Sequence, residues 1–390
     1  MEKEVSLYIH IPFCISKCDY CDFFSVTGCQ SLQDDYIQAL GSEMEERLKE
    51  YGPAKIKSLY VGGGTPSLLS QNQLKKLADI INPLKKTENC EFTFEVNPDD
   101  VTEELLQALD KTGVNRISCG LQSFSQKVLE NIHRRAGAEQ VEKALLLLKK
   151  NWKHKLSVDL ICGLPFESQK SMLEGLKKLC RLGIPHISFY SLCVEEETPL
   201  GQAIITNKIK YDYDFSDQLW IKGRDFLLQN AYEQYEVSNF CLPGYECIHN
   251  MTYWTHGDYI GIGSGASGTI YNTDGSASRW TNTKDIKKYM EYWKKKPLCL
   301  NDIPQDVEKI EQETALFEYF MMALRTKRGI SSGEYKSIFG REIPVKIIQI
   351  LDKWCRRGLC VCLCPAEKEK SYHLNEKGLL FLNSLLEELF

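Results

Sequence analysis

The sequence predicts an α/β protein with a central parallel sheet, followed by a smaller, mostly helical region. Apolar strand-like runs alternate with helical segments over residues 5–192, and repeated strand–helix units of this kind build parallel sheets. The chain has 390 residues, 43% of them hydrophobic, which suits two or three domains. Six strand-like runs lie near residues 5–11, 56–61, 91–96, 115–120, 155–161 and 186–192. Six strands alone do not distinguish an open barrel from a doubly wound sheet.

The helical segments between the strands begin and end at residues with capping chemistry. Ser70, followed three positions later by Gln73, forms a capping box that predicts the start of one helix. Thr102 predicts the N-cap of the next helix, whose first turn holds the acidic residues 103–104, and Gly113 predicts its end. Helices at these places supply the crossover connections that parallel strands need.

The rest of the chain divides into two further parts. Residues 236–300 form a connecting segment rich in glycine and aromatic residues, after a core of residues 1–235. Residues 301–390 read as helices, a strand pair near 359–374 and a last helix, an order that resembles a small winged-helix-like domain. We expect the boundary between these two parts near residue 300, where the runs Lys-Lys-Lys-Pro (294–297) and Asn-Asp-Ile-Pro (301–304) lie.

Composition and charge exclude several classes of protein. The net charge of −5 argues against a broad nucleic-acid interface, so no nucleic-acid partner is expected. No apolar run approaches the roughly 18 residues of a membrane span, and the N-terminus shows no signal peptide. We therefore expect a cytoplasmic protein, in which its 16 cysteines stay reduced.

Three cysteines near the N-terminus carry the most specific signal. Cys14, Cys18 and Cys21 have the spacing C-x3-C-x2-C. Three thiolates hold three irons of a 4Fe–4S cluster and leave the fourth iron open, whereas fully ligated clusters take four cysteines. An open metal position can chelate a substrate or cofactor. A structural cluster, or a zinc site with a distant fourth ligand, remains an alternative for the spacing alone.

Unusual polar and glycine residues lie where the predicted strands end. Ligands of parallel α/β folds bind at the C-terminal ends of strands. The second strand ends in Gly62-Gly-Gly-Thr-Pro66, where bare backbone can approach a ligand. Glu95 ends the third strand, Gln122 lies just past the fourth, and Asp159 lies within the fifth. A buried carboxylate such as Glu95 needs a partner, which is either a cofactor or a basic side chain.

The run Tyr-Ile-His-Ile-Pro-Phe (8–13) before the cysteines resembles the radical S-adenosylmethionine superfamily. In detail it is similar to the branch with oxygen-independent coproporphyrinogen III oxidase (HemN-like) and the HemW-type heme chaperones. The resemblance implies a partial (β/α)6 TIM-like barrel that binds a 4Fe–4S cluster through Cys14, Cys18 and Cys21, and S-adenosylmethionine. The residues implied to contact the cofactor are Tyr8, Tyr20, Gly63, Gly64, Thr65, Glu95, Gln122, Arg134 and Asp159.

Within this branch, the sequence favours the chaperones over the oxidase. The oxidase carries a further cysteine where this chain has Phe23, and it has a long N-terminal arm, whereas the first strand here begins near Val5. The oxidase alternative is radical oxidative decarboxylation in porphyrin biosynthesis, and enzymatic activity remains uncertain. A radical enzyme that acts on heme itself is a third alternative.

The run His249-Asn-Met-Thr-Tyr-Trp254 is similar to a motif proposed to bind heme in the chaperones. The candidate heme-binding residues are His249, Tyr253 and Trp254; a polar loop beside a packed aromatic pair is the structural alternative. Two histidines common in the family are replaced here by Ala136 and Ser267.

The resemblance implies a cytoplasmic heme chaperone that transfers heme to acceptor proteins. It also implies an electron donor for the cluster, and it leaves peripheral membrane contact and a homodimer open. The alternating Cys360, Cys362 and Cys364 would share one face of a strand. We expect them on a half-buried strand of the wing rather than at a metal site.

Overall fold

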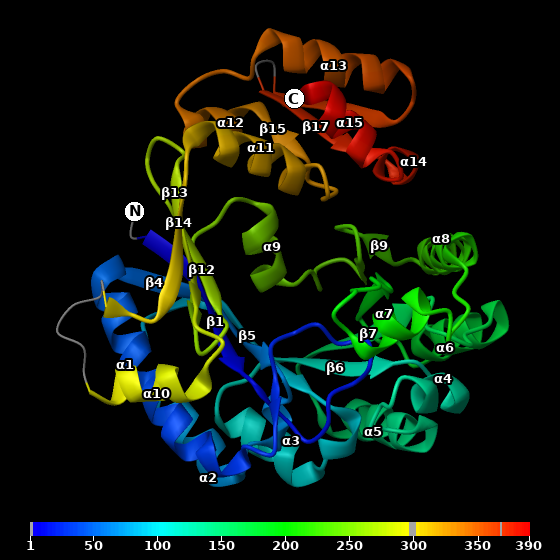
Figure 1. The fold of residues 1–390 in the computed structure, drawn as a ribbon. Coiled ribbons are helices and arrows are strands. Elements are labelled where there is room, and N and C mark those ends of the chain that lie inside the picture. Colours follow the sequence, from blue (N-terminus) through cyan, green and yellow to red (C-terminus); the bar gives the residue numbers. More distant parts are fainter. Residues whose placement is uncertain (1–2, 296–301, 367–368) are drawn as a thin grey trace.

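A computed structural model describes residues 3–295, 302–366 and 369–390 of the chain (Figure 1). The boundary expected near residue 300 lies partly in residues 296–301, outside the described residues. Within the described part, twelve strands form one sheet in the order β14-β13-β12-β11-β1-β4-β5-β6-β7-β8-β10-β9. No helix in the described ranges is long and apolar enough to cross a bilayer.

The six predicted strands form the parallel centre of this sheet, as expected. They are β1 (Lys3–Ile11), β4 (Ala54–Gly63), β5 (Lys86–Val96), β6 (Arg116–Gln122), β7 (Lys155–Cys162) and β8 (His186–Ser191). Gln122 is the last residue of β6 rather than the first residue after it. A short parallel pair, β2 (Phe13–Cys14) and β3 (Val26–Thr27), closes the base of the loop that carries the three cysteines.

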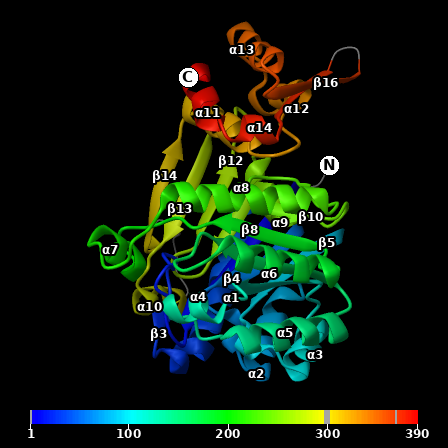
Figure 2. The same cartoon turned by 90° about the vertical axis from the view of Figure 1, so that its right-hand side faces the viewer.

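Helices connect these strands and cover the outside of the sheet (Figures 1 and 2). They are α1 (Gln33–Tyr51), α2 (Gln71–Ile81), α3 (Glu103–Lys111), α4 (Gln126–Asn131), α5 (Ala138–Asn151), α6 (Gln169–Arg181), α7 (Pro199–Ile205) and α8 (Tyr213–Gln229). Ser70 forms the predicted capping box of α2, and the Thr102 hydroxyl accepts from the backbone N–H of Leu105. Gly113 follows α3 with a φ of 87°, a left-handed position that glycine adopts without strain.

The strands are apolar on their outer face and polar on their inner face. On β1, Leu7 and Ile9 are fully buried in the main hydrophobic cluster, whereas the alternate residues Ser6 and Tyr8 make polar side-chain contacts, to Thr252 and to His10 respectively. A sheet with helices outside and polar side chains inside is a partial barrel, so the fold prediction of a six-unit barrel is confirmed and the doubly wound alternative is wrong.

The connecting segment extends the sheet at both ends instead of forming a separate layer. Its strands are β10 (Asn239–Cys241), β11 (Tyr259–Ile262), β12 (Ser267–Tyr271) and β13 (Ala277–Asn282), and β9 (Glu233–Gln234), just before the segment, pairs with β10 at one edge of the sheet. β11 is parallel to β1, while β12, β13 and β14 (Gln305–Ile310) continue antiparallel. Two helices belong to the same region, α9 (Ile248–Trp254) and α10 (Ile286–Lys294). The sheet thus runs across the expected boundary near residue 300.

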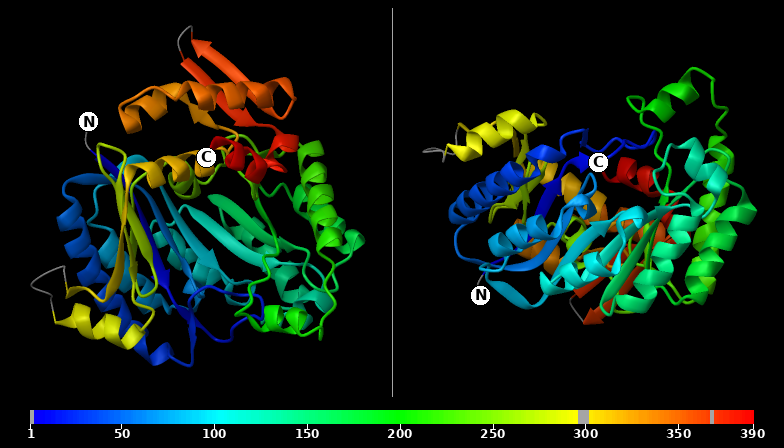
Figure 3. Two further views of the ribbon diagram at one scale, coloured as in Figure 1. Left: turned by 45° about the horizontal axis from the view of Figure 1, so that its top comes forward. Right: turned by 90° about the horizontal axis from the view of Figure 1, so that it is seen from below.

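The C-terminal region has its own hydrophobic cluster, which begins at Tyr319. Its elements are α11 (Gln312–Ala323), β15 (Ile330–Ser331), α12 (Ser332–Phe339), α13 (Val345–Arg356), β16 (Cys360–Ala366), β17 (Glu369–Leu374), α14 (Glu376–Leu379) and α15 (Leu382–Leu389). β15, β17 and β16 form an antiparallel sheet, which confirms the winged-helix-like order. On β16, Cys360 is buried and Cys364 exposed. Figure 1 shows this region above α9, and Figure 3 shows the same region, in orange and red, from two further sides.

Candidate functional site

The loop between β1 and α1 places the three motif cysteines at the C-terminal end of the barrel strands. All three thiols are half-buried. Cys14 Sγ lies 3.4 Å from Thr65 Oγ1, and Arg134 Nη1 donates to Cys18 Sγ over 3.4 Å. In the described ranges, no three His, Cys, Asp or Glu side chains are close enough to enclose a metal ion as they stand. The donor set of three thiols on one loop beside a cavity nevertheless fits a cluster with one open iron.

The glycine run at the end of β4 brings two backbones together beside this loop. Gly64 N–H donates to Ile11 O over 2.8 Å, and Thr65 N–H donates to Phe13 O over 2.9 Å. A methyl group on Gly63 would lie 2.4 Å from the His10 ring, and one on Gly62 would lie 2.8 Å from the Glu95 carboxyl group. Only glycine leaves room here, so the run forms a cradle of bare backbone beside the cluster loop.

A cavity of about 380 Å³ joins the cradle and the loop inside the barrel mouth. It is lined by nine of the twelve predicted cluster and cofactor residues: Tyr20, Cys21, Gly63, Gly64, Thr65, Glu95, Gln122, Arg134 and Asp159. Cys14 and Cys18 do not line it, and neither does Tyr8, whose hydroxyl group contacts His10 Nδ1 at 2.9 Å. Residues from five different parts of the sequence thus meet at one cavity.

Two carboxyl groups face this cavity from neighbouring parts of the barrel. Glu95 Oε1 accepts from the Tyr60 hydroxyl over 2.7 Å, and Oε2 accepts from Gly63 N–H over 3.1 Å. The Ser118 hydroxyl lies 2.9 Å from one oxygen of Asp159. Burial, aided by the nearby Asp159 and opposed by the two hydrogen bonds, raises the pKa of Glu95 to about 7. Burial also raises the pKa of Asp159.

Arg134 and Gln122 complete the wall of the cavity. Arg134 Nη2 donates to Gly120 O over 2.7 Å, while its Nε atom is buried without a hydrogen-bond partner. Gln122 has a φ of 66°, which is uncommon for a residue other than glycine. The strained backbone and the orphaned Nε both lie at the cavity, as expected where a protein surface is shaped for a ligand.

Sequence reasoning missed several residues of the cavity. Tyr60, Ser118, Tyr190 and Cys193 also line it. Tyr60 stands two residues before Gly62, and Ser118 stands four residues before Gln122 on the same strand face. The period-two alternation of strands could therefore have found both residues. Cys193 lies in the loop after β8 and carries no such signal.

The heme-motif residues lie at the other end of the barrel from the cysteine loop. Helix α9 lies above the strands in Figure 1, whereas the dark-blue cysteine loop lies below. His249 is 1% exposed. Its Nδ1 is 2.9 Å from Ser58 Oγ, and its Nε2 is 2.8 Å from the Tyr253 hydroxyl. Burial lowers the pKa of His249 to about 3, so the ring is neutral. Tyr253 and Trp254 are half-buried.

The structure therefore brings His249 and Tyr253 together but leaves no free nitrogen on His249. The observed arrangement has the packed, hydrogen-bonded character of the structural alternative. Ligation of iron by His249 requires one nitrogen to give up its present partner, Ser58 on β4 or Tyr253 in α9 itself, and it requires the buried ring to become accessible.

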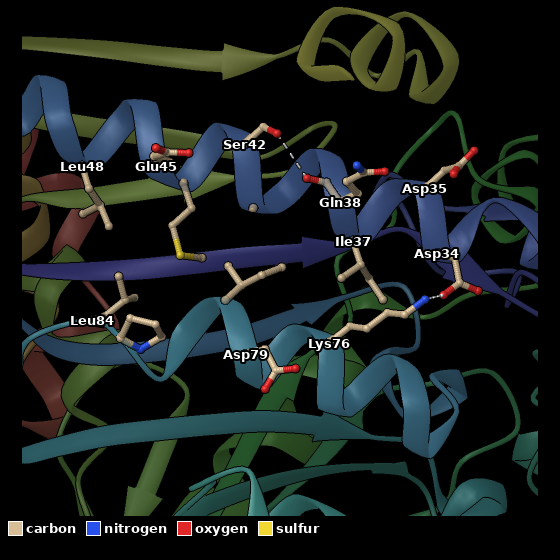
Figure 4. Close-up of a pocket in the computed structure, with 14 residues that line it drawn as sticks. Asp34, Asp35, Ile37, Gln38, Ser42, Glu45, Leu48, Lys76, Asp79 and Leu84 are labelled. Carbon is tan, nitrogen blue, oxygen red and sulfur yellow. Dashed lines mark hydrogen bonds and ion pairs between the residues drawn. The ribbon is translucent and has the colours of Figure 1, made fainter. Parts of the chain in front are cut away.

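A second hollow, on the outer surface, contains none of the predicted residues. It is a groove of about 900 Å³ between α1 and α2 (Figure 4). Asp34 and Lys76 form an ion pair across it, and Ile37 and Leu84 contribute apolar walls. The strand ends do not reach this groove, so the cavity in the barrel mouth remains the candidate site.

Comparisons with known proteins agree with this architecture. The family model described as the radical SAM superfamily matches residues 8–179. The chain is 34% identical to the heme chaperone HemW of Escherichia coli K12 over 385 residues, which cover 98% of this chain and 97% of that protein. It is 31% identical to the heme chaperone HemW of Bacillus subtilis over 383 residues, with 97% of both chains covered.

A solved structure shows the same fold over the whole chain. It is that of coproporphyrinogen III oxidase (HemN) from Escherichia coli, described as a radical SAM enzyme. The two share 20% identity and superpose with a TM-score of 0.79, which covers 100% of this chain and 90% of the oxidase. The likeness to the oxidase concerns the fold, whereas the identity to the chaperones extends through the sequence. The chain belongs to the HemW family of heme chaperones within the radical SAM superfamily.

Proposed function

We propose that this protein is a heme chaperone that holds a 4Fe–4S cluster and S-adenosylmethionine at the barrel mouth and passes heme to acceptor proteins. The observation that carries the proposal is the convergence of the cysteine loop and the glycine cradle on one cavity, together with extended identity to heme chaperones. An electron donor for the cluster and the heme acceptors are the partners that this function requires.

In this proposal the three motif cysteines hold the cluster, and the cavity holds S-adenosylmethionine. Cys14, Cys18 and Cys21 supply three thiolates, and the bare backbone of Gly63 and Gly64 receives the methionine end of the cofactor. Glu95 accepts from the hydroxyl or amino groups of the cofactor. A bound cluster and cofactor would supply one-electron chemistry; the chain's own groups bind the cofactor, orient it and enclose it.

Heme binding is assigned to the motif on α9. His249 and Tyr253 are the proposed iron ligands, and Trp254 packs against the macrocycle. Since His249 is 1% exposed, this assignment includes displacement of α9 from the barrel. The burial of His249 keeps its ring neutral, which is the form that ligates iron.

Anaerobic titration of the cluster-loaded protein with hemin tests the proposal. Stoichiometric binding in the wild type, weakened by His249→Ala and by Tyr253→Phe, supports the chaperone and this site. His154→Ala is the matched control, because His154 is a surface histidine paired with Asp110 far from α9. Equal binding by all variants would discard the α9 site.

The oxidase alternative is tested on the same protein. Phe23, at the position of the oxidase's further cysteine, is 66% exposed at the cavity rim, where it offers no thiol. Incubation with coproporphyrinogen III, S-adenosylmethionine and a reductant should give no vinyl porphyrin product. Turnover to that product, with weak hemin binding, would replace the chaperone by an oxidase.

A further inference from the structure

We propose that Tyr60 is the positioning residue that orients the Glu95 carboxylate toward the cofactor cavity, and that His249 holds the ring of Tyr60 from the opposite side. The inference rests on the proposed function, in which Glu95 receives S-adenosylmethionine. It gives the motif on α9 a role inside the barrel that does not depend on heme.

The Glu95 side chain is fixed at both oxygens. Tyr60 donates to Oε1 over 2.7 Å, and the N–H of Gly63 donates to Oε2 over 3.1 Å. Gly62 lies against both partners: a methyl group there would be 2.8 Å from the carboxyl group of Glu95 and 2.8 Å from Cε1 of Tyr60. The carboxylate, the tyrosine and the glycine cradle are therefore packed as one unit.

The Tyr60 hydroxyl group can donate a hydrogen bond to Glu95 throughout the neutral pH range. Burial raises the pKa of Tyr60 well above its ordinary value, and the charge of Glu95 raises it further. The phenol therefore stays protonated, and its O–H remains available as a donor. A hydrogen bond from a neutral donor to a carboxylate favours the ionised form of the carboxyl group.

His249 closes the other side of the Tyr60 ring. The two ring centroids are 5.0 Å apart with planes inclined by 32°. His249 is itself fixed by Ser58 and by Tyr253, so it cannot turn away without breaking two hydrogen bonds. A rigid ring behind Tyr60 restricts the positions its hydroxyl group can take, as precise placement of a binding group requires.

This arrangement makes the pH dependence of cofactor binding a direct measure of the role of Tyr60. The titratable groups that face Glu95 are Tyr60 on β4, Tyr8 on β1, Asp159 on β7, Tyr190 on β8 and Tyr253 on α9. Burial raises the pKa of all four tyrosines, so none of them ionises near neutrality. Burial raises the pKa of Glu95 to about 7, which places its titration within the accessible range.

The direction in which pH changes the affinity follows from the charge state of Glu95 that binds the cofactor. Ionised Glu95 accepts hydrogen bonds from S-adenosylmethionine, and protonated Glu95 loses that capacity. Affinity therefore falls as the pH drops through the pKa of Glu95. Loss of the Tyr60 hydroxyl raises this pKa, so the fall in affinity occurs at higher pH.

Equilibrium binding of S-adenosylmethionine to the cluster-loaded protein, measured anaerobically between pH 6 and 9, tests the inference. In Tyr60→Phe we expect the profile to move up by about one pH unit, which gives about fivefold weaker binding at pH 7 and nearly tenfold weaker binding at pH 6. The affinities of variant and wild type should converge at pH 9. Titration of the cofactor itself is common to all proteins and cancels in their difference.

Two controls separate positioning from a general structural effect. Tyr232→Phe removes another buried hydroxyl, one that donates to Ile184 O over 2.5 Å and not to Glu95, so its profile should match the wild type. Glu95→Gln should bind weakly without any pH dependence near 7. A profile of Tyr60→Phe that is lowered equally at every pH, or not at all, would overturn the inference.

The contribution of His249 is measured in a double-mutant cycle. His249→Ala should move the profile in the same direction as Tyr60→Phe, and it should add no shift in the Tyr60→Phe background, because the two residues act through one hydrogen bond. His249→Gln, which can still hydrogen-bond Ser58, provides a second variant if the alanine variant does not fold. Additive shifts would overturn the part assigned to His249.

The inference and the proposed function fail in different ways. If the cluster-loaded wild type does not bind S-adenosylmethionine, the proposed function is wrong. If the wild type binds it and Tyr60→Phe leaves the pH profile unchanged, only the role of Tyr60 is wrong.

Discussion

Replacement of Gly64 by alanine is the sharpest steric test of the cofactor cradle. A methyl group at this position would lie 2.8 Å from the carbonyl carbon of Pro12, 2.9 Å from Phe13 O and 3.0 Å from Ile11 O. All three atoms belong to the backbone, so no side chain can turn aside to make room. The cysteine loop and the end of β4 must therefore move apart.

The cost of that movement follows from the contacts it disturbs. Overpacking of this kind costs about 1–3 kcal/mol. The displacement also strains the two hydrogen bonds that join the strands here, from Gly64 N–H to Ile11 O at 2.8 Å and from Thr65 N–H to Phe13 O at 2.9 Å. At roughly 1.2 °C per kcal/mol for a chain of this size, the melting temperature should fall by about 1–4 °C. Because Cys14 follows Phe13 directly, cluster incorporation should fall as well.

The assay compares thermal unfolding, and iron and sulfide content after anaerobic reconstitution, for the wild type and Gly64→Ala. Gly333→Ala is the matched control: its methyl group would meet only Oε1 of Glu369, the end of a flexible side chain, at 2.7 Å. Because Gly333 lies in helix α12, alanine should leave stability unchanged or raise it slightly. An unchanged melting temperature and full iron content in Gly64→Ala would refute the steric argument.

Three further predictions test other parts of the molecule. Simultaneous replacement of the three motif cysteines by alanine should abolish iron and sulfide binding, and retained iron would place the cluster elsewhere. Arg116→Ala should lower the free energy of unfolding by about 1–3 kcal/mol in urea titrations, because Arg116 Nη1 lies 3.5 Å from Oε2 of the buried Glu91, whereas Lys155 still pairs with the same oxygen at 3.6 Å; an unchanged free energy would contradict this. Burial raises the pKa of Glu236 to about 7, so the protonated carboxyl stabilises the fold fully below its unfolded pKa, and this stabilisation is lost as pH rises through about 7. Glu236→Gln should therefore be more stable than the wild type at pH 8 and similar to it at pH 5, whereas the opposite order would refute the pKa argument.

The sequence predicted the barrel strands because each is a buried apolar run with capped helices around it. Ser70 and Thr102 show local signals whose structural outcome depends on only a few neighbouring residues. The antiparallel strands β12 and β13 were not predicted, since their short, glycine- and aromatic-rich sequences acquire strand character only by pairing with β11 and β14.

The candidate site was predictable to a similar extent. Residues at strand ends, such as Thr65 and Glu95, were found because all parallel strands end at one edge. The environment of His249 was not predictable, because it depends on Ser58 and Tyr60, roughly 190 residues away in the sequence. Long-range pairing of this kind leaves no local pattern.

The position of β1 inside the sheet also determines when the protein can complete its fold during synthesis. Strand β1 lies between β4 and β11, and Ile9 pairs with Ile262. One edge of β1, next to the cysteine loop, therefore stays unpaired until some 250 further residues have been translated. At about 5–20 residues per second, this interval lasts roughly 12–50 s. The nascent chain then carries an exposed strand edge beside three free thiols, so oxidants and aggregation threaten it most before β11 emerges from the ribosome.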